Sequence, residues 1–170
     1  MIGYIVKNMF SPWRSAYIDT FKGGEKRKTC LFCEMKKNRK ADQKNLVVWR
    51  GKNCFVVMNK YPYNSGHVLI VPYKHTADFL SFLPEEYKEI MATAARSIKA
   101  LQAFSKPEGF NFGANLGRVA GAGVDKHIHF HIVPRWKGDV NFMPVLADIK
   151  IISESIETTR KALIKKFKKL

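Results

Sequence analysis

Three of the five histidines of this 170-residue chain alternate with apolar residues in the stretch KHIHFHIVPRW, residues 126–136. Successive side chains of a β-strand point to opposite faces. The alternation therefore predicts a strand over residues 127–134, with imidazoles on one face and apolar side chains on the other. Pro134 should end this strand, since proline cannot donate a hydrogen bond to an interior ladder. The three histidines are His127, His129 and His131.

Four other short apolar runs also have the character of strands. Residues 46–49 and 54–59 flank the turn-like sequence RGKN and predict a hairpin. Residues 67–72 follow a second turn and are too uniformly apolar to be exposed on both faces. Residues 110–115 predict one more strand ahead of a glycine-bearing loop.

Two segments have helical periodicity. Over residues 84–104 apolar positions recur at three- and four-residue steps, and Pro84 suits a first helical turn. A basic amphipathic helix is expected over about 152–168. The polar residues 19–29 and 35–45 are expected to form loops.

This order of elements predicts an α+β fold, with a mostly antiparallel five-stranded sheet, a long helix and a C-terminal helix, the helices packed to one side. A chain of 170 residues can bury a real core as a single domain. Within this domain we distinguish an N-terminal segment (1–45), a core (46–150) and a basic C-terminal helix (151–170).

The formal net charge of +16 favours polyanionic partners, whether nucleic acid, acidic membranes or phosphorylated metabolites. The lysines are dispersed, so simple solubility explains the charge equally well. No apolar run approaches the roughly 18 residues of a membrane span, and residues 1–18 lack the pattern of a signal peptide. Three cysteines are too few for a disulfide scaffold. A cytoplasmic location is therefore expected.

The residues alone leave three explanations for the alternating histidines: coincidence on a solvated face, a metal site, or a nucleophilic or acid–base centre that acts on phosphate. We favour the last, because an unprotonated imidazole nitrogen is a competent nucleophile and flanking imidazoles can donate to phosphoryl oxygens. The loop ahead of the strand contains Gly117, Gly121 and Gly123. Such loops let backbone N–H groups approach an anion.

The stretch HIHFHIV, residues 127–133, fits the pattern His-x-His-x-His followed by apolar residues. The chain thus resembles the histidine triad superfamily of nucleotide hydrolases and transferases. Residues 56–75 resemble the first block of that family, and residues 111–148 resemble its bacterial dinucleoside tetraphosphate phosphorylase branch, also called ATP adenylyltransferase. Residues 10–18 are similar to the N-terminal segment of this branch.

This resemblance implies an HIT-like fold, a homodimer with sheets joined across the interface, and cleavage of dinucleoside polyphosphates through a nucleotidyl-histidine. Diadenosine tetraphosphate is the expected substrate, cleaved to ADP and ATP with inorganic phosphate. Hydrolysis, action on adenylated small molecules, or nucleotide binding with little turnover are the alternatives.

By the same resemblance His129 is the nucleophile, while His127 and His131 orient the site and hold phosphoryl oxygens. Substrate contacts are implied for Asn59 at the ribose, and for His67, Asn115, Gly121 and Gly123 near the phosphates. Many relatives place Gln, Ser or Thr a few residues before the triad, whereas residues 121–124 here offer only backbone donors. This departure leaves the choice between hydrolysis and phosphorolysis open.

Cys30 and Cys33 form a C-x-x-C motif, which alone fits a redox pair, half of a zinc site or an accident. Zinc-bearing members of the superfamily add one histidine after the first block and the first histidine of the triad. The resemblance therefore implies a structural Cys2His2 zinc site made of Cys30, Cys33, His75 and His127. Cys54 is expected in the core.

The C-terminal residues 160–170 combine six basic residues with an apolar stripe. A helix docked by its apolar side is favoured over a membrane-surface or nucleic-acid helix. Trp13 and Trp136 are equally compatible with a base-binding surface, a dimer surface or core packing.

Overall fold

The computed structural model describes residues 29–139 and 154–170, and every structural statement below refers to them. The expectations for residues 1–28, Trp13 among them, and for residues 140–153 lie outside this part of the chain. The elements are α2 (Leu31–Lys37), β1 (Val47–Arg50), β2 (Cys54–Met58), β3 (Val68–Pro72), α3 (Pro84–Ser105), β4 (Gly109–Ala114), β5 (Phe130–Arg135) and α5 (Ile156–Phe167). The short 3-10 helices are η1 (Arg39–Ala41), η2 (Phe79–Ser81) and η3 (Arg118–Ala120).

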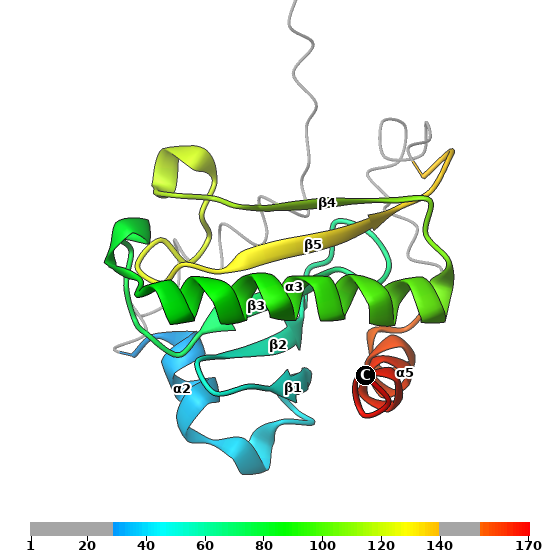
Figure 1. Ribbon diagram of the computed structural model, residues 1–170, viewed down its shortest axis with the longest axis horizontal. Coiled ribbons are helices and arrows are strands. Elements are labelled where there is room, and N and C mark those ends of the chain that lie inside the picture. Colours follow the sequence, from blue (N-terminus) through cyan, green and yellow to red (C-terminus); the bar gives the residue numbers. More distant parts are fainter. Residues whose placement is uncertain (1–28, 140–153) are drawn as a thin grey trace, which may run out of the picture.

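The five strands form one sheet in the order β1-β2-β3-β5-β4, and every neighbouring pair is antiparallel. Strand β5 is an inner strand between β3 and β4, because Leu69 of β3 and Gly113 of β4 both lie opposite His131. Figure 1 shows α3 in front of the sheet, running in much the same direction as β4 and β5, with α5 near β1. The predicted α+β fold with a five-stranded antiparallel sheet is confirmed.

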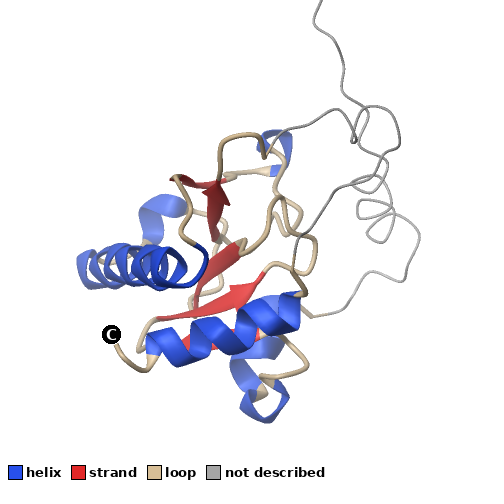
Figure 2. Cartoon of the chain, turned by 90° about the vertical axis from the view of Figure 1, so that its right-hand side faces the viewer, coloured by secondary structure: helices blue, strands red, loops and turns tan. Residues whose placement is uncertain are grey.

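Strands β2 and β3 are buried on both faces, and their alternate residues enter different cores, whereas the edge strand β4 is partly exposed. Ile70 of β3 and Phe130 and Ile132 of β5 face a large core that contains α3 and α5. Leu69 and Val71 of β3 face a smaller cluster around Phe32 of α2. In Figure 2, α3 lies to the left of the strands and α5 is in the foreground. The two expected helices, α3 and α5, therefore share one side of the sheet. Helix α2, which was not expected, lies on the opposite face because the apolar Phe32 packs there.

The helix boundaries follow local signals. Pro84 begins α3, and the Glu86 carboxylate accepts a hydrogen bond from the Leu83 N–H at 2.9 Å. Helix α3 ends at Lys106, which has a left-handed φ of 47°. Ser155 caps α5 by accepting from the Thr158 N–H at 3.1 Å. No helix of the described chain is both long enough and apolar enough to cross a membrane.

Three boundaries differ from the sequence predictions. The loop expected over 35–45 is wrong at its start, because α2 continues to Lys37 and η1 covers Arg39–Ala41. Strand β5 begins at Phe130 rather than at residue 127, and it continues past Pro134, which pairs with Phe110 of β4, to Arg135. Its ladder with β3 ends at the pair Ile70 and Phe130, since β3 closes on Pro72, which has no N–H to continue it.

Candidate active site and metal cluster

The three alternating histidines lie on the sheet face that carries α2. The rings of His129 and His131 have centroids 5.0 Å apart. The Phe32 ring lies 5.1 Å from the His129 ring and 5.3 Å from the His127 ring. His127 and His129 are buried, at 1% and 7% exposure, while His131 is less enclosed. The predicted separation of imidazoles and apolar residues onto opposite faces is confirmed.

The protonation state of His129 follows from a single backbone contact. Its Nδ1 lies 3.0 Å from the carbonyl oxygen of His127, which can only accept, so Nδ1 carries the proton and donates it. Burial lowers the pKa of His129, although this hydrogen bond opposes the shift. The ring is therefore neutral near pH 7 and its Nε2 has a free lone pair. An imidazole held in this tautomer can act as a nucleophile.

A second chain of contacts fixes the tautomer of His131. The backbone N–H of Tyr63 donates to Nδ1 of His67 at 3.0 Å, and Nδ2 of Asn59 lies 3.2 Å from the same atom. His67 Nδ1 is thus an acceptor, and the proton of this ring is on Nε2. That N–H donates to Nδ1 of His131 at 3.0 Å. His131 consequently carries its own proton on Nε2, where it is a hydrogen-bond donor.

The structure thus brings His67 and Asn59 beside the triad, as the sequence interpretation required. The Asn59 amide is used locally, because its Oδ1 also accepts from the Tyr61 N–H at 2.9 Å. Tyr63 was missed from the sequence, although its ring stacks on His131 with centroids 5.9 Å apart and an interplanar angle of 12°. The turn-forming sequence YPYNSG, which returns residue 63 to residue 67, was the available signal.

The glycine loop is brought together with Asn115, and it meets the histidines through one backbone hydrogen bond, from the His127 N–H to the Val124 carbonyl at 3.4 Å. The Nδ2 of Asn115 donates to the Gly121 carbonyl at 3.4 Å. Gly121 has a φ of 89°, a left-handed conformation that favours glycine. Gly123 is exposed in the same loop. The loop is therefore shaped by local backbone demands, and its contact with a ligand stays a prediction.

Cys30, Cys33, His75 and His127 converge on one point, with one ligand atom of each within 4.8 Å of all the others. The distances to Nδ1 of His127 are 3.4 Å from Cys30 Sγ, 3.8 Å from Cys33 Sγ and 3.2 Å from His75 Nδ1. Zinc bonds of about 2.0–2.3 Å give a tetrahedron with edges of roughly 3.3–3.8 Å. The spacing is therefore compatible with a zinc site.

His127 is also in the tautomer that a metal ligand needs. Its Nε2 lies 2.9 Å from the Pro72 carbonyl oxygen and donates to it, which leaves Nδ1 unprotonated toward the cysteines. Burial lowers the pKa of His127 to about 4, so the ring is neutral. Burial and the neighbouring Cys30 raise the pKa of the Cys33 thiol, and a bound cation would favour its deprotonated form instead.

The Nε2 of His127 thus contacts the Pro72 carbonyl, and its Nδ1 faces the Cys–His cluster. His127 contacts the His129 ring through its backbone carbonyl instead. The local sequence explains the convergence of the cluster: α2 presents the two cysteines from its N-cap and first turn, and His75 and His127 flank the adjacent ends of β3 and β5.

Cys54, Trp136 and helix α5, which the sequence analysis also named, make contacts within the fold. Cys54 is fully buried beside Thr93, and burial raises the pKa of its thiol to about 11. The indole N–H of Trp136 donates to the Ser105 carbonyl at 3.3 Å. Helix α5 docks by its apolar side, with Leu163 and Phe167 buried in the large core.

A five-stranded antiparallel sheet, with three same-faced histidines along the inner strand β5 and the residues just before it, defines an α+β protein of the histidine-triad type. The HIT domain family matches residues 40–138, and the chain belongs to this family, which confirms the sequence resemblance.

Among curated relatives, the AP-4-A phosphorylase of Mycobacterium tuberculosis is 41% identical over 123 residues, which cover 72% of this chain. The match spans 63% of that relative, less than two thirds of its length. An uncharacterised HIT-like protein of Saccharolobus solfataricus is 32% identical, with coverage of 83% of this chain and 99% of the relative.

Solved structures of the family have the same fold. A Zn-bound histidine triad family protein from Mycobacterium smegmatis superposes with a TM-score of 0.66 at 25% identity, covering 83% of this chain and 94% of that one. A hypothetical histidine triad nucleotide-binding protein from Sulfolobus tokodaii has a TM-score of 0.67 at 25% identity, with coverage of 83% and 93%.

Proposed function

We propose that this protein is a nucleotide-processing enzyme, a nucleotidyl transferase that cleaves dinucleoside polyphosphates with His129 as nucleophile. The observation that carries the proposal is the hydrogen bond from His129 Nδ1 to the His127 carbonyl, because it leaves a lone pair on Nε2 of a neutral ring. The similarity to a mycobacterial AP-4-A phosphorylase supports diadenosine tetraphosphate as substrate.

In the first step, Nε2 of His129 attacks the α-phosphorus of one adenylate. A nitrogen–phosphorus bond forms, the bond from phosphorus to the bridging oxygen breaks, and ATP leaves. Negative charge on the phosphoryl oxygens is stabilised by the Nε2–H of His131, whose direction is fixed by the hydrogen bond from His67. The covalent step divides one difficult displacement into two easier ones.

In the second step, an oxygen of inorganic phosphate attacks the same phosphorus, and the bond to His129 breaks to release ADP. Water in place of phosphate would release AMP. We assign substrate contacts to the residues near or ahead of the triad, namely Asn59, His67, Asn115, Gly121 and Gly123. Since residues 121–124 carry no polar side chain, their backbone N–H groups are the donors available to the leaving phosphates.

We also propose a structural zinc ion held by Cys30, Cys33, His75 and His127. The donor set and the spacing of its atoms fit zinc, and the relative from M. smegmatis is a Zn-bound protein. When bound, the metal would join α2 to the sheet. His127 then contributes to the reaction by positioning, since its carbonyl orients His129.

The organisation of the protein is part of the same proposal. We infer a single domain over residues 1–170, composed of the segments 1–45, 46–150 and 151–170, that acts as a homodimer. Light scattering coupled to gel filtration measures this directly, and a monomer at micromolar concentration would contradict it. Nucleic acid stays an alternative partner for the basic surface.

The test of function is product analysis after incubation with diadenosine tetraphosphate, with and without inorganic phosphate. Phosphate-dependent release of ADP and ATP identifies a phosphorylase, and AMP release irrespective of phosphate identifies a hydrolase. The absence of products at high enzyme concentration, together with tight nucleotide binding, would leave a binding module and overturn the enzymatic proposal.

A further inference from the structure

A polar hollow of about 490 Å³ lies near the residues that follow β3, apart from both the triad and the metal cluster. None of the described histidines or clustered cysteines lines it. It is built from the end of α2, η1, the β1–β2 turn, the exit of β3 and the first turn of α3. Its lining residues are Lys36, Arg39, Lys52, Asn53, Tyr73, Lys74 and Glu86.

The lining is strongly unbalanced in charge. Four cations face the hollow against the single carboxylate of Glu86. This carboxylate is already used, since it lies 3.6 Å from the Lys74 ammonium and accepts from the Leu83 N–H at 2.9 Å. A second carboxylate, that of Glu89, is not part of the lining and accepts from the Asn53 N–H at 3.0 Å. The lining itself thus has a net charge of +3 in one concave place, and like charges at close range favour the binding of an anion.

Two of the cations are held in place. Lys36 donates to the Tyr73 carbonyl at 3.2 Å, and its ammonium lies 5.7 Å from the centre of the Tyr73 ring. Lys74 donates to the Ser81 carbonyl and lies 5.8 Å from the Phe82 ring. These contacts hold two donors beside the hollow before a ligand arrives.

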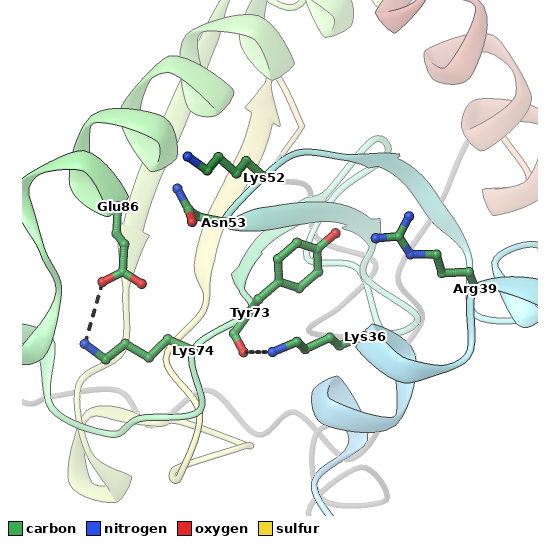
Figure 3. A pocket seen from close by; sticks show the side chains of 7 residues that line it. All are labelled: Lys36, Arg39, Lys52, Asn53, Tyr73, Lys74 and Glu86. Atoms are coloured by element: carbon green, nitrogen blue, oxygen red, sulfur yellow. Dashed lines mark hydrogen bonds and ion pairs between the residues drawn. The ribbon is translucent and has the colours of Figure 1, made fainter.

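The other two cations are available. Within residues 29–139 and 154–170, neither Arg39 nor Lys52 makes a hydrogen bond or ion pair through its side chain. Figure 3 shows the four cationic side chains distributed around the Tyr73 ring, with dashed lines only at Lys36 and Lys74. Two fixed and two free cations around one hollow can surround several phosphate groups at once.

We propose that this hollow binds the phosphate chain of a small, multiply charged molecule, either free polyphosphate or a nucleoside polyphosphate. The volume lies within the range of small-molecule sites. A nucleic-acid strand is less suited, because bases need an open aromatic face to stack on. The Tyr73 ring already stacks on Phe55, with centroids 5.6 Å apart, and Lys36 lies against it. The proposal does not depend on His129 being a nucleophile.

The first experiment is a site-resolved NMR titration of the full metal-loaded chain with sodium tripolyphosphate at about 150 mM salt, where surface electrostatics are screened. Saturable shifts of the backbone amides of residues 36–39, 52–53 and 73–74 are expected. Shifts confined to residues 127–131, or shifts that never saturate, would overturn the proposal.

The second experiment compares two double variants of equal net charge. Arg39→Ala with Lys52→Ala removes the two free cations and should weaken tripolyphosphate binding about tenfold or more, as expected for lost charged hydrogen bonds. Lys99→Ala with Lys161→Ala removes two exposed lysines outside the hollow and should change affinity less than about twofold. Equal weakening in both would show that only the overall positive field matters, and the proposal would fail.

A parallel titration with a nucleoside triphosphate distinguishes free polyphosphate from a nucleoside polyphosphate as the ligand. If it binds as tripolyphosphate does, with the same dependence on Arg39 and Lys52, the phosphate chain alone is recognised. If it binds more tightly with that dependence, the nucleotide is the natural ligand. Binding of a single-stranded oligonucleotide that requires both residues, without tripolyphosphate binding, would overturn the proposal in favour of nucleic acid.

Discussion

Strand β5 and the three residues before it, 127–129, have two faces with different side chains. Toward α3 and α5, Ile128, Phe130 and Ile132 enter a continuous apolar core. Toward α2, the alternating residues are imidazoles, and at least one ring nitrogen of each is hydrogen-bonded to a neighbouring group. The first, the apolar face, stabilises the fold through burial. The second, the chemical face, carries the residues of the proposed reaction. Neighbouring residues of one short segment therefore offer a clean experimental separation of stability from activity.

The sharpest test of the chemical face is His129→Ala. Removal of the nucleophile should lower turnover of diadenosine tetraphosphate by about 10³-fold or more, as for other nucleophiles that act within a catalytic unit. Initial rates measured by chromatography of the nucleotides check this. Nucleotide affinity should change little. Because the buried ring packs against Phe32, its removal should also lower the thermal midpoint, so rates are compared per folded molecule. Retention of more than a tenth of the activity would exclude His129 as nucleophile.

The matching test of the apolar face is Ile132→Ala. Ile132 is fully buried, and its truncation should lower the free energy of unfolding by about 3 kcal/mol, within the range for large-to-small core substitutions. Urea titration followed by circular dichroism measures the change. The rate per folded molecule should stay near that of the parent protein. A comparable loss of specific activity would show that the two faces are coupled rather than separate.

A smaller effect is expected from the metal cluster, which meets the chemical face only through His127. Cys33→Ser should abolish binding of one zinc per chain, as measured by elemental analysis. It should also lower turnover by about tenfold, the size found when groups that orient an active-site ligand are lost. Cys54→Ser is the control, because Cys54 lies in the other core and should leave zinc content unchanged. Full zinc occupancy in Cys33→Ser would contradict the assignment.

The smallest effect is expected at the end of β5, away from both faces. Arg135 forms a two-point contact with Asp139, at 2.6 and 2.8 Å, which lowers the pKa of this carboxyl to about 2. A depressed carboxyl pKa stabilises the fold above the ordinary value near 4, and this stabilisation is lost as the pH falls toward 2. Asp139→Asn should therefore cost less than about 1 kcal/mol at neutral pH.

The pH dependence separates this prediction from a simple packing defect. Thermal midpoints of Asp139→Asn and the parent protein should differ at pH 7 and converge between pH 5 and pH 2. A difference that persists unchanged at pH 2 would show that the carboxylate charge is not the cause.

The alternation of histidines and apolar residues was sufficient to predict the two faces of β5, because the two-residue period of a strand is set by backbone geometry alone. The boundary of β5 was not predictable in the same way. It depends on Pro72, which lies more than fifty residues away in sequence and stops the ladder from the opposite strand. Helix α2 was missed because its seven residues are too few to show a helical period, and its position depends on a single buried side chain, Phe32.

The sequence predicted some features of the site and missed others, for a similar reason. The positions of Cys30, Cys33 and His75 came from family resemblance, and no local pattern could have joined α2 to the ends of two strands. The tautomers were invisible in the sequence, since they depend on which carbonyl or N–H each imidazole meets after folding. Tyr63 was overlooked because its backbone N–H, rather than its side chain, makes the contact that fixes His67.

The arrangement around residue 127 has a consequence for protein engineering. One imidazole satisfies a β3 carbonyl and contributes to the Cys–His cluster, while the peptide oxygen of the same residue aligns the ring two positions later. Any residue at this position supplies the peptide oxygen, but only the imidazole anchors it to β3 through the Pro72 carbonyl. A designer who wished to exchange or delete the ion would therefore have to keep residue 127 in place by another contact.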